Sequence, residues 1–116
     1  MSRCAIVGVG LTKFGKHVDV PMKTMAAEAI EAALIDAAID PGEIDAVYFA
    51  NSLSAVITGQ VAVVGQVALG DTGIHGVPVY NIDNACAGSS TAVTLATHSV
   101  RAGAARRGGA ARAGGR

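Results

Sequence analysis

The sequence predicts an α/β protein with a mostly parallel sheet and the element order βαβαβα. Three short apolar runs have the length and composition of buried strands, and helical spacing of small aliphatic residues follows or separates them. Alternation of strands with helices is the pattern that builds parallel sheets. The predicted strands are 4–10, 46–50 and 77–82, and the predicted helices are 24–38, 58–69 and 87–102.

The first half of the chain reads as strand, crossover helix and strand. The apolar run 4–10 ends in glycines, which fits a strand buried on both faces with a turn at its carboxyl end. In 24–38, alanine, isoleucine and leucine recur every three or four residues, with acidic residues off that stripe. Thr24 is the expected N-cap, and Pro41 follows the end of the helix. This unit favours pairing of 4–10 with 46–50 in one parallel sheet.

The second half repeats the alternation. Valines and alanines of 58–69 fall on one helical face, although Gly65 weakens helix propensity, and Gly70 is the expected left-handed stop. The run 77–82 is the third predicted strand. The helix 87–102 that follows starts with very small residues, which permits close approach to another backbone.

The end of the sequence differs in composition from the rest. Residues 104–116 contain only alanine, glycine and arginine, so we expect them to be disordered, because they bury too little apolar surface to order themselves. We therefore expect an incomplete domain over 1–103, truncated before a fourth strand, and a tail over 104–116. Residues 1–100 carry nine acidic and four basic residues, whereas 101–116 carry five arginines and no acid.

Composition excludes several function classes. An aromatic content of 3% argues against base stacking, so we expect no nucleic-acid partner, although the arginine-rich tail is the feature that would suggest one. No apolar run is long enough to predict a membrane span. Two distant cysteines give no disulfide framework, which favours the cytoplasm, and three scattered histidines predict no metal site. The glycines of 8–10 lack the third glycine of a dinucleotide fingerprint, because Lys13 stands there.

Cys86 is the candidate nucleophile. It lies where the strand 77–82 turns into the helix 87–102, at the carboxyl end of a parallel strand, where open α/β sheets bind their ligands. Free N–H groups and the positive end of the helix dipole stabilise a thiolate at such a position. The alternative is a small buried residue in the first turn of a helix. Asp83 or Asn84 is a candidate for orienting the thiol or for pairing across a dimer, and the sequence does not choose between these roles.

The other polar candidates favour structural roles. His98 lies twelve residues beyond Cys86, about 18 Å along a helix, and is too far to act as its base. His17 follows the first predicted strand in a lysine-flanked loop at the same sheet edge, but nothing in the sequence fixes its distance from Cys86, and we expect it to be solvated. His75 precedes the third strand and is expected at the opposite edge. Ser89 and Ser90 do not form G-x-S-x-G and are expected to cap or pack.

A resemblance to a known family adds to this interpretation. The segment Asn-Ala-Cys-Ala-Gly-Ser-Ser-Thr-Ala at 84–92 resembles the nucleophile segment of the thiolase superfamily. Residues 5–15 resemble the opening strand and loop of that family, especially in sterol-carrier-protein-type thiolases and their lipid-transfer relatives. The resemblance covers 3–103, and further dipeptides follow in the expected order: Glu28-Ala29, Asp40-Pro41, Ile44-Asp45 and Leu69-Gly70.

The resemblance implies a fold of two similar βαβαβαββ halves in five layers and an acyl-CoA C-acyltransferase of lipid metabolism. Its cysteine attacks an acyl-CoA thioester, carries the acyl group, and passes it to the enolate of a second acyl-CoA, or the reverse. Only Cys86 matches a catalytic position, since the activating residues belong mainly to the other half. Acyl-CoA is thus the expected substrate, with no cofactor, and a homo-oligomer or a complementary chain is the expected partner.

Two alternatives remain open at this point. Residues 83–88 also resemble the β-ketoacyl synthase branch, which differs in its acyl carrier. Because this chain lacks the second half, a non-catalytic thiolase-like subunit or fragment that binds a lipid or a partner chain is the other alternative.

Overall fold

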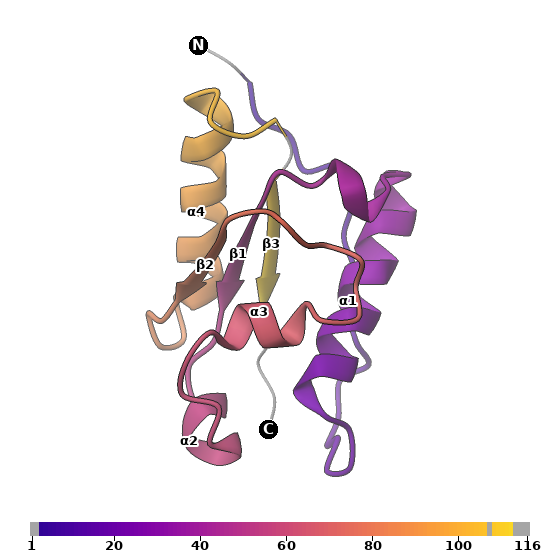
Figure 1. The fold of residues 1–116 in the computed structure, drawn as a ribbon, viewed down its shortest axis with the longest axis vertical. Coiled ribbons are helices and arrows are strands. Elements are labelled where there is room, and N and C mark those ends of the chain that lie inside the picture. The colour runs from indigo at the N-terminus through magenta and orange to yellow at the C-terminus, as the bar shows by residue number, and fades with distance from the viewer. Residues whose placement is uncertain (1–2, 107, 113–116) are drawn as a thin grey trace.

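The computed structural model describes residues 3–106 and 108–112 and confirms an α/β fold with a small parallel sheet (Figure 1). One 3₁₀ turn, Pro41–Glu43, precedes the first strand. The helices are α1 Met22–Ala37, α2 Ser54–Thr58, α3 Val64–Ala68 and α4 Gly88–Arg101, and the strands are β1 Ala46–Ala50, β2 Val79–Ile82 and β3 Gly108–Arg112.

The sheet has the order β2-β1-β3, and both pairs are parallel. The register places Tyr48 opposite Tyr80, and the two rings stack with centroids 4.9 Å apart. The hydroxyl of Tyr48 also forms a hydrogen bond with the hydroxyl of Ser99 on α4. The register therefore fixes the end of β1 beside the end of β2, where Asn51 N–H donates to the carbonyl oxygen of Ile82.

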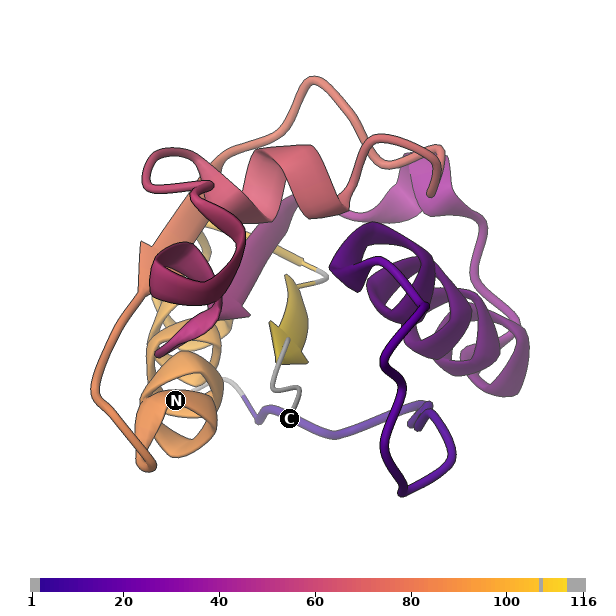
Figure 2. The same ribbon diagram turned by 90° about the horizontal axis from the view of Figure 1, so that it is seen from below.

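Strand β1 is buried along its whole length because helices cover both of its faces (Figure 2). Phe49 packs with α1 and α3 residues on one face, whereas Tyr48 packs with Ala92 of α4 on the other. Full burial of an aliphatic or aromatic side chain stabilises a fold by about 1.5–3 kcal/mol. Phe49 and Val47 are the largest fully buried side chains of the described residues.

The predicted strand at 4–10 is wrong. These residues, which we call the N-terminal strap, form no strand and lie along α1, where the backbone N–H of Val9 donates to the carboxylate of Asp36. Ile6 is 79% exposed and Val7 is 65% exposed. The physical reason is edge occupancy: β2 takes one edge of β1 and β3 takes the other, which leaves no edge of β1 for the strap.

The expectation of disorder at 104–116 does not hold for 108–112, which form β3. Residues 108–112 are ordered by parallel backbone pairing with β1, which does not depend on the burial of large side chains. Just before β3, Ala105 is buried and Arg106 N–H donates to the carboxylate of Asp45. Residues 107 and 113–116 lie outside the described part of the chain.

The predicted helix 58–69 is two short helices, α2 and α3. Thr58 donates its hydroxyl to the Ser54 carbonyl, and Gly59 ends α2 with a φ of 78°, a conformation that glycine adopts readily. The expected cap and stop are also corrected: Pro21 holds the N-cap position of α1, and α3 ends at a right-handed Leu69. By contrast, the predictions of a long helix from 24 and from 87 agree with α1 and α4 to within two residues.

None of the helices in the described residues has both the length and the apolar character that crossing a membrane requires.

Gly65 fixes the separation between α3 and the sheet. A Cβ atom there would stand 2.8 Å from both the Asn81 Oδ1 and the Phe49 Cβ. We therefore expect Gly65→Ala to lower the free energy of unfolding by about 1–3 kcal/mol, because overpacking forces backbone shifts. Urea unfolding followed by circular dichroism measures this. Gly42→Ala is the matched control, since a Cβ at Gly42 meets nothing within 4 Å, and equal losses in both variants would contradict the packing argument.

Candidate functional site

Cys86 lies between the carboxyl end of β2 and the first turn of α4. Strands β1 and β2 are parallel, and α4 starts at the end of the sheet toward which they point (Figure 1). Cys86 is a free, exposed cysteine. The predicted strand-to-helix junction is therefore present, and the alternative of a buried, packing cysteine is not observed.

The turn that carries Cys86 is held by its own backbone and by Asp83. Ala85 has a φ of 46°, which is uncommon for a residue with a Cβ, and its N–H donates to the Asp83 Oδ1 at 3.1 Å. Ala87 N–H donates to the Asn84 carbonyl at 2.9 Å, and Gly88 N–H donates to the Ala85 carbonyl at 3.2 Å. These bonds reverse the chain sharply, and Cys86 is exposed in the turn.

Asn84 connects the turn to the helix. Its side-chain amide donates to the Thr91 hydroxyl at 2.9 Å, and that hydroxyl donates to the Ala87 carbonyl. The side chains of Asp83 and Asn84, the candidates for orienting the thiol, thus bind the Ala85 backbone and the Thr91 hydroxyl. The spacing of Asp83 two residues before Ala85 is the Asx-turn pattern, and this signal was available in the sequence.

The first turn of α4 packs closely against the sheet. No side chain caps the helix, whose N-cap residue is Ala87. Gly88 is buried, and a Cβ there would meet the Ala50 Cβ at 3.3 Å, so the helix start packs tightly against β1. The Oγ atom of Ser89 is buried with no hydrogen-bond partner in the described residues. Gly88 therefore brings the helix start against the sheet, whereas Ser90 and Cys86 stay exposed.

No histidine side chain hydrogen-bonds to Cys86 within the described residues. The Nε2 atom of His17 donates to the Lys13 carbonyl at 2.6 Å, in the loop before α1. His98 lies in the last turn of α4, at the opposite end of that helix from Cys86. His75 precedes β2, on the amino side of the sheet. His75 and His98 therefore lie away from Cys86, as their places in the sequence predict, and His17 lies in the loop before α1.

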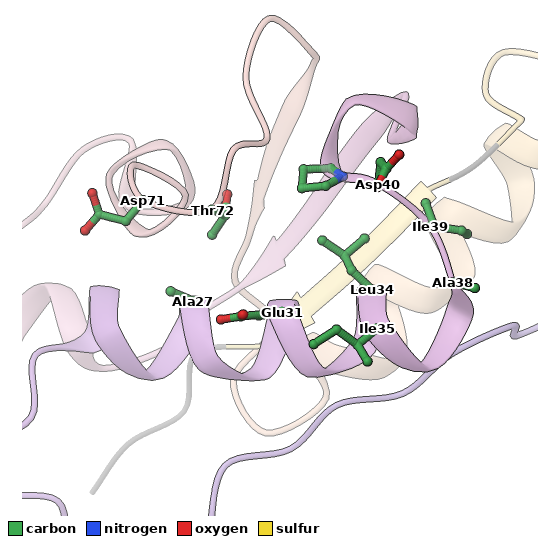
Figure 3. A pocket seen from close by; sticks show the side chains of 10 residues that line it. Ala27, Glu31, Leu34, Ile35, Ala38, Ile39, Asp40, Asp71 and Thr72 are labelled. Carbon is green, nitrogen blue, oxygen red and sulfur yellow. The ribbon is translucent and has the colours of Figure 1, made fainter.

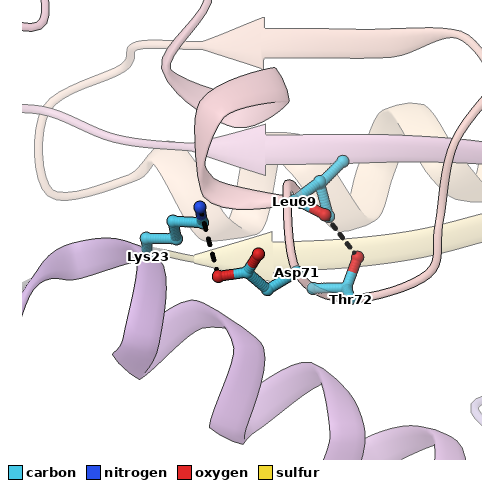
Figure 4. Close-up of polar contacts among 4 residues, drawn as sticks. All are labelled: Lys23, Leu69, Asp71 and Thr72. Atoms are coloured by element: carbon cyan, nitrogen blue, oxygen red, sulfur yellow. Dashed lines mark hydrogen bonds and ion pairs between the residues drawn. The ribbon is translucent and has the colours of Figure 1, made fainter.

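A hollow lies elsewhere, between α1 and the loop at 71–72, with a volume of about 610 Å³ (Figure 3). Its lining combines apolar side chains with acidic ones, including Leu34, Glu31 and Asp71. Asp71 forms an ion pair with Lys23 at 3.1 Å, and the Thr72 hydroxyl donates to the Leu69 carbonyl (Figure 4). Neither Cys86 nor a histidine lines this groove. In the part of the chain described, no three histidine, cysteine or acidic residues gather as metal ligands would.

Comparison with known proteins places these features in a family. Residues 4–110 match the family model described as thiolase, N-terminal domain. The chain is 36% identical over 102 residues to the benzoylsuccinyl-CoA thiolase subunit BbsB of Thauera aromatica, covering 84% of this chain and 24% of that protein. It is 32% identical to an acetyl-CoA acetyltransferase of Methanocaldococcus jannaschii, covering 90% and 26%. Sterol carrier protein 2 of Gallus gallus is 34% identical, covering 87% and 18%.

Solved structures share the architecture. The Ltp2-ChsH2(DUF35) aldolase matches with a TM-score of 0.68 and 25% identity, covering 87% of this chain and 25% of that one. The priming β-ketosynthase of the R1128 polyketide pathway matches with a TM-score of 0.55 and 25% identity, covering 77% and 26%. The chain thus spans about a quarter of the length of its first curated relatives.

The Asx turn at Asp83 generates a test of the site geometry. Asp83→Ala removes the acceptor for the Ala85 N–H, and we expect a loss of about 0.5–1.5 kcal/mol in local stability. Amide hydrogen exchange at Ala85 measures this loss as faster exchange. Asp83→Asn is the matched control because it keeps a side-chain oxygen acceptor. If Asn and Ala variants exchange equally fast at Ala85, the hydrogen bond does not hold the turn.

Proposed function

The chain belongs to the thiolase family through its N-terminal domain, and from this we propose that Cys86 accepts an acyl group from acyl-CoA. The observation that carries the proposal is the exposed thiol in the tight turn between β2 and α4. The family's relatives include named acetyltransferases and a thiolase subunit, which supports acyl-CoA chemistry. The substrate and the activity of this chain are parts of the proposal.

In the proposed step, the sulfur of Cys86 as a thiolate attacks the thioester carbonyl carbon of acyl-CoA. A new carbon–sulfur bond forms, the negative charge moves to the carbonyl oxygen, and the tetrahedral adduct collapses by releasing coenzyme A as a thiolate that takes up a proton. The product is an acyl thioester on Cys86. Backbone N–H groups at the start of α4 are suited to stabilise negative charge near the sulfur.

Transfer of the acyl group to an enolate of a second acyl-CoA, or the reverse thiolysis, needs an acid/base group beside Cys86. The described residues place no histidine there. We therefore propose that the full reaction requires a second copy or a complementary chain, and that this chain by itself carries out the acylation half. A free thiol at Cys86 also requires a reducing compartment, for which we propose the cytoplasm.

Two alternative functions differ from this proposal in the donor of the acyl group: one predicts another donor, and the other predicts that Cys86 is not acylated. The resemblance of residues 83–88 to the β-ketoacyl synthase branch, together with the likeness to a priming β-ketosynthase, makes an acyl carrier protein a second candidate donor. The absence of a neighbouring histidine in the described residues favours a non-catalytic thiolase-like subunit. Acylation by acyl-CoA, by acyl carrier protein, or by neither separates the three.

The decisive measurement is the intact mass of the protein after incubation with acetyl-CoA and with longer acyl-CoAs. We expect one acyl group on the wild type and on Cys4→Ser, and none on Cys86→Ser, because only Cys86 lies in the turn. Peptide mapping locates the adduct. Cys4 is the matched control because it is the second free, exposed cysteine. Equal labelling of both cysteines would indicate nonspecific thioester exchange and would refute the proposal.

A parallel incubation with acyl carrier protein that carries the same acyl group identifies the donor class. Labelling of Cys86 by acyl-CoA and not by the carrier protein is the expected result. The opposite preference would support a ketosynthase. No adduct from either donor, in a chain whose circular dichroism shows a folded protein, would support the non-catalytic alternative.

A further inference from the structure

The N-terminal strap and β3 are two candidates for one position in the sheet. β1 has two edges, and β2 occupies one of them. The other edge pairs with β3, whose sequence Gly-Gly-Ala-Ala-Arg contains no large apolar residue. The strap contains Ile6, Val7 and Val9, which are the β-branched residues that strands favour, and all three are more than half exposed.

The direction and position of the strap suit its pairing with β1 in place of β3. In Figure 1 the strap descends along α1 from the N-terminus, in the same general direction as the arrows of the sheet. Figure 2 shows it passing between α1 and α4 on the side where β3 lies. A strap placed beside β1 would be joined to it through α1, which is the strand–helix–strand crossover that parallel sheets use. No reversal of the strap is needed.

A side-chain hydrogen bond and two close backbone approaches connect the strap to α1. The Val9 N–H bond to Asp36 is exposed. Gly8 and Gly10 allow the close approach, since Cβ atoms there would stand 2.5 Å and 2.0 Å from the carbonyl oxygens of Ala33 and Ala29. These contacts leave the large side chains of the strap in water. Pairing with β1 would instead bury them against the layers that cover β1, which is the favourable direction for apolar surface.

We propose that the strap and β3 compete for the same edge of β1, and that the strap becomes a strand when 108–112 leave that edge. The chain can therefore form either of two sheets, with the strand order β2-β1-β3 or β2-β1-strap. This replacement of β3 by the strap is a conformational property of the fold and is independent of the proposed acylation of Cys86.

Amide hydrogen exchange tests the competition. We expect a chain lacking 104–116 to show amides of 6–10 that exchange at least about tenfold more slowly than in the full chain, while β1 stays protected. A chain lacking only 113–116 is the matched control and should exchange as the full chain does. If 6–10 exchange no more slowly after the longer deletion, whether β1 stays protected or the chain unfolds, the proposal is wrong.

Two substitutions sharpen the test: Ala110→Pro needs no shortening of the chain, and Ile6→Asp asks whether the strap itself causes the slowing. Ala110→Pro in the full chain removes a backbone donor from β3 opposite Tyr48, and the same slowing at 6–10 is expected. Fast exchange at 6–10 in that variant counts against the proposal. Ile6→Asp should leave amide exchange of the full chain unchanged, because Ile6 is exposed there. In the chain lacking 104–116, the same substitution should abolish the slowing at 6–10. Slowing that survives Ile6→Asp would show that the strap does not enter the sheet.

Discussion

Burial of β1 on both faces is the constraint on which the rest of the structure depends. A strand whose five residues are all buried requires a layer on each side, so α1 and α3 cover Phe49 while α4 covers Tyr48. The same constraint sets the position of Cys86. For α4 to lie against β1, the chain must turn back immediately after β2, and the residues of that turn become the exposed segment at the end of the sheet.

The parts of the fold that the sequence predicted are those determined by local pattern. The apolar run at 46–50 and the periodic stretches that became α1 and α4 carry their structure in their own spacing. The predicted junction at Cys86 is confirmed for the same reason, since a strand, a turn and a helix follow one another directly. The Asp83 bond to Ala85 is also a local signal, although it is informative only once the turn is located.

The parts that the sequence did not predict depend on competition between distant segments. Residues 4–10 have the composition of a strand, but whether they pair depends on which segment occupies the edge of β1, and composition alone cannot decide that. The stretch 58–69 has the periodicity of one helix. Its division arises because Gly59 ends α2, and Val63 adopts a φ of 48° before α3 packs against Asn81, whose Oδ1 accepts the Gly65 N–H.

The stacked pair Tyr48 and Tyr80 has an optical consequence. The chain contains two tyrosines and no tryptophan, so its near-ultraviolet absorption and emission come almost entirely from these two rings. One ring is buried on the central strand and the other is half exposed on its neighbour, across the same rung of the ladder. The molecule therefore carries its own spectroscopic reporter of β1–β2 pairing, sensitive to separation of the strands without any added dye.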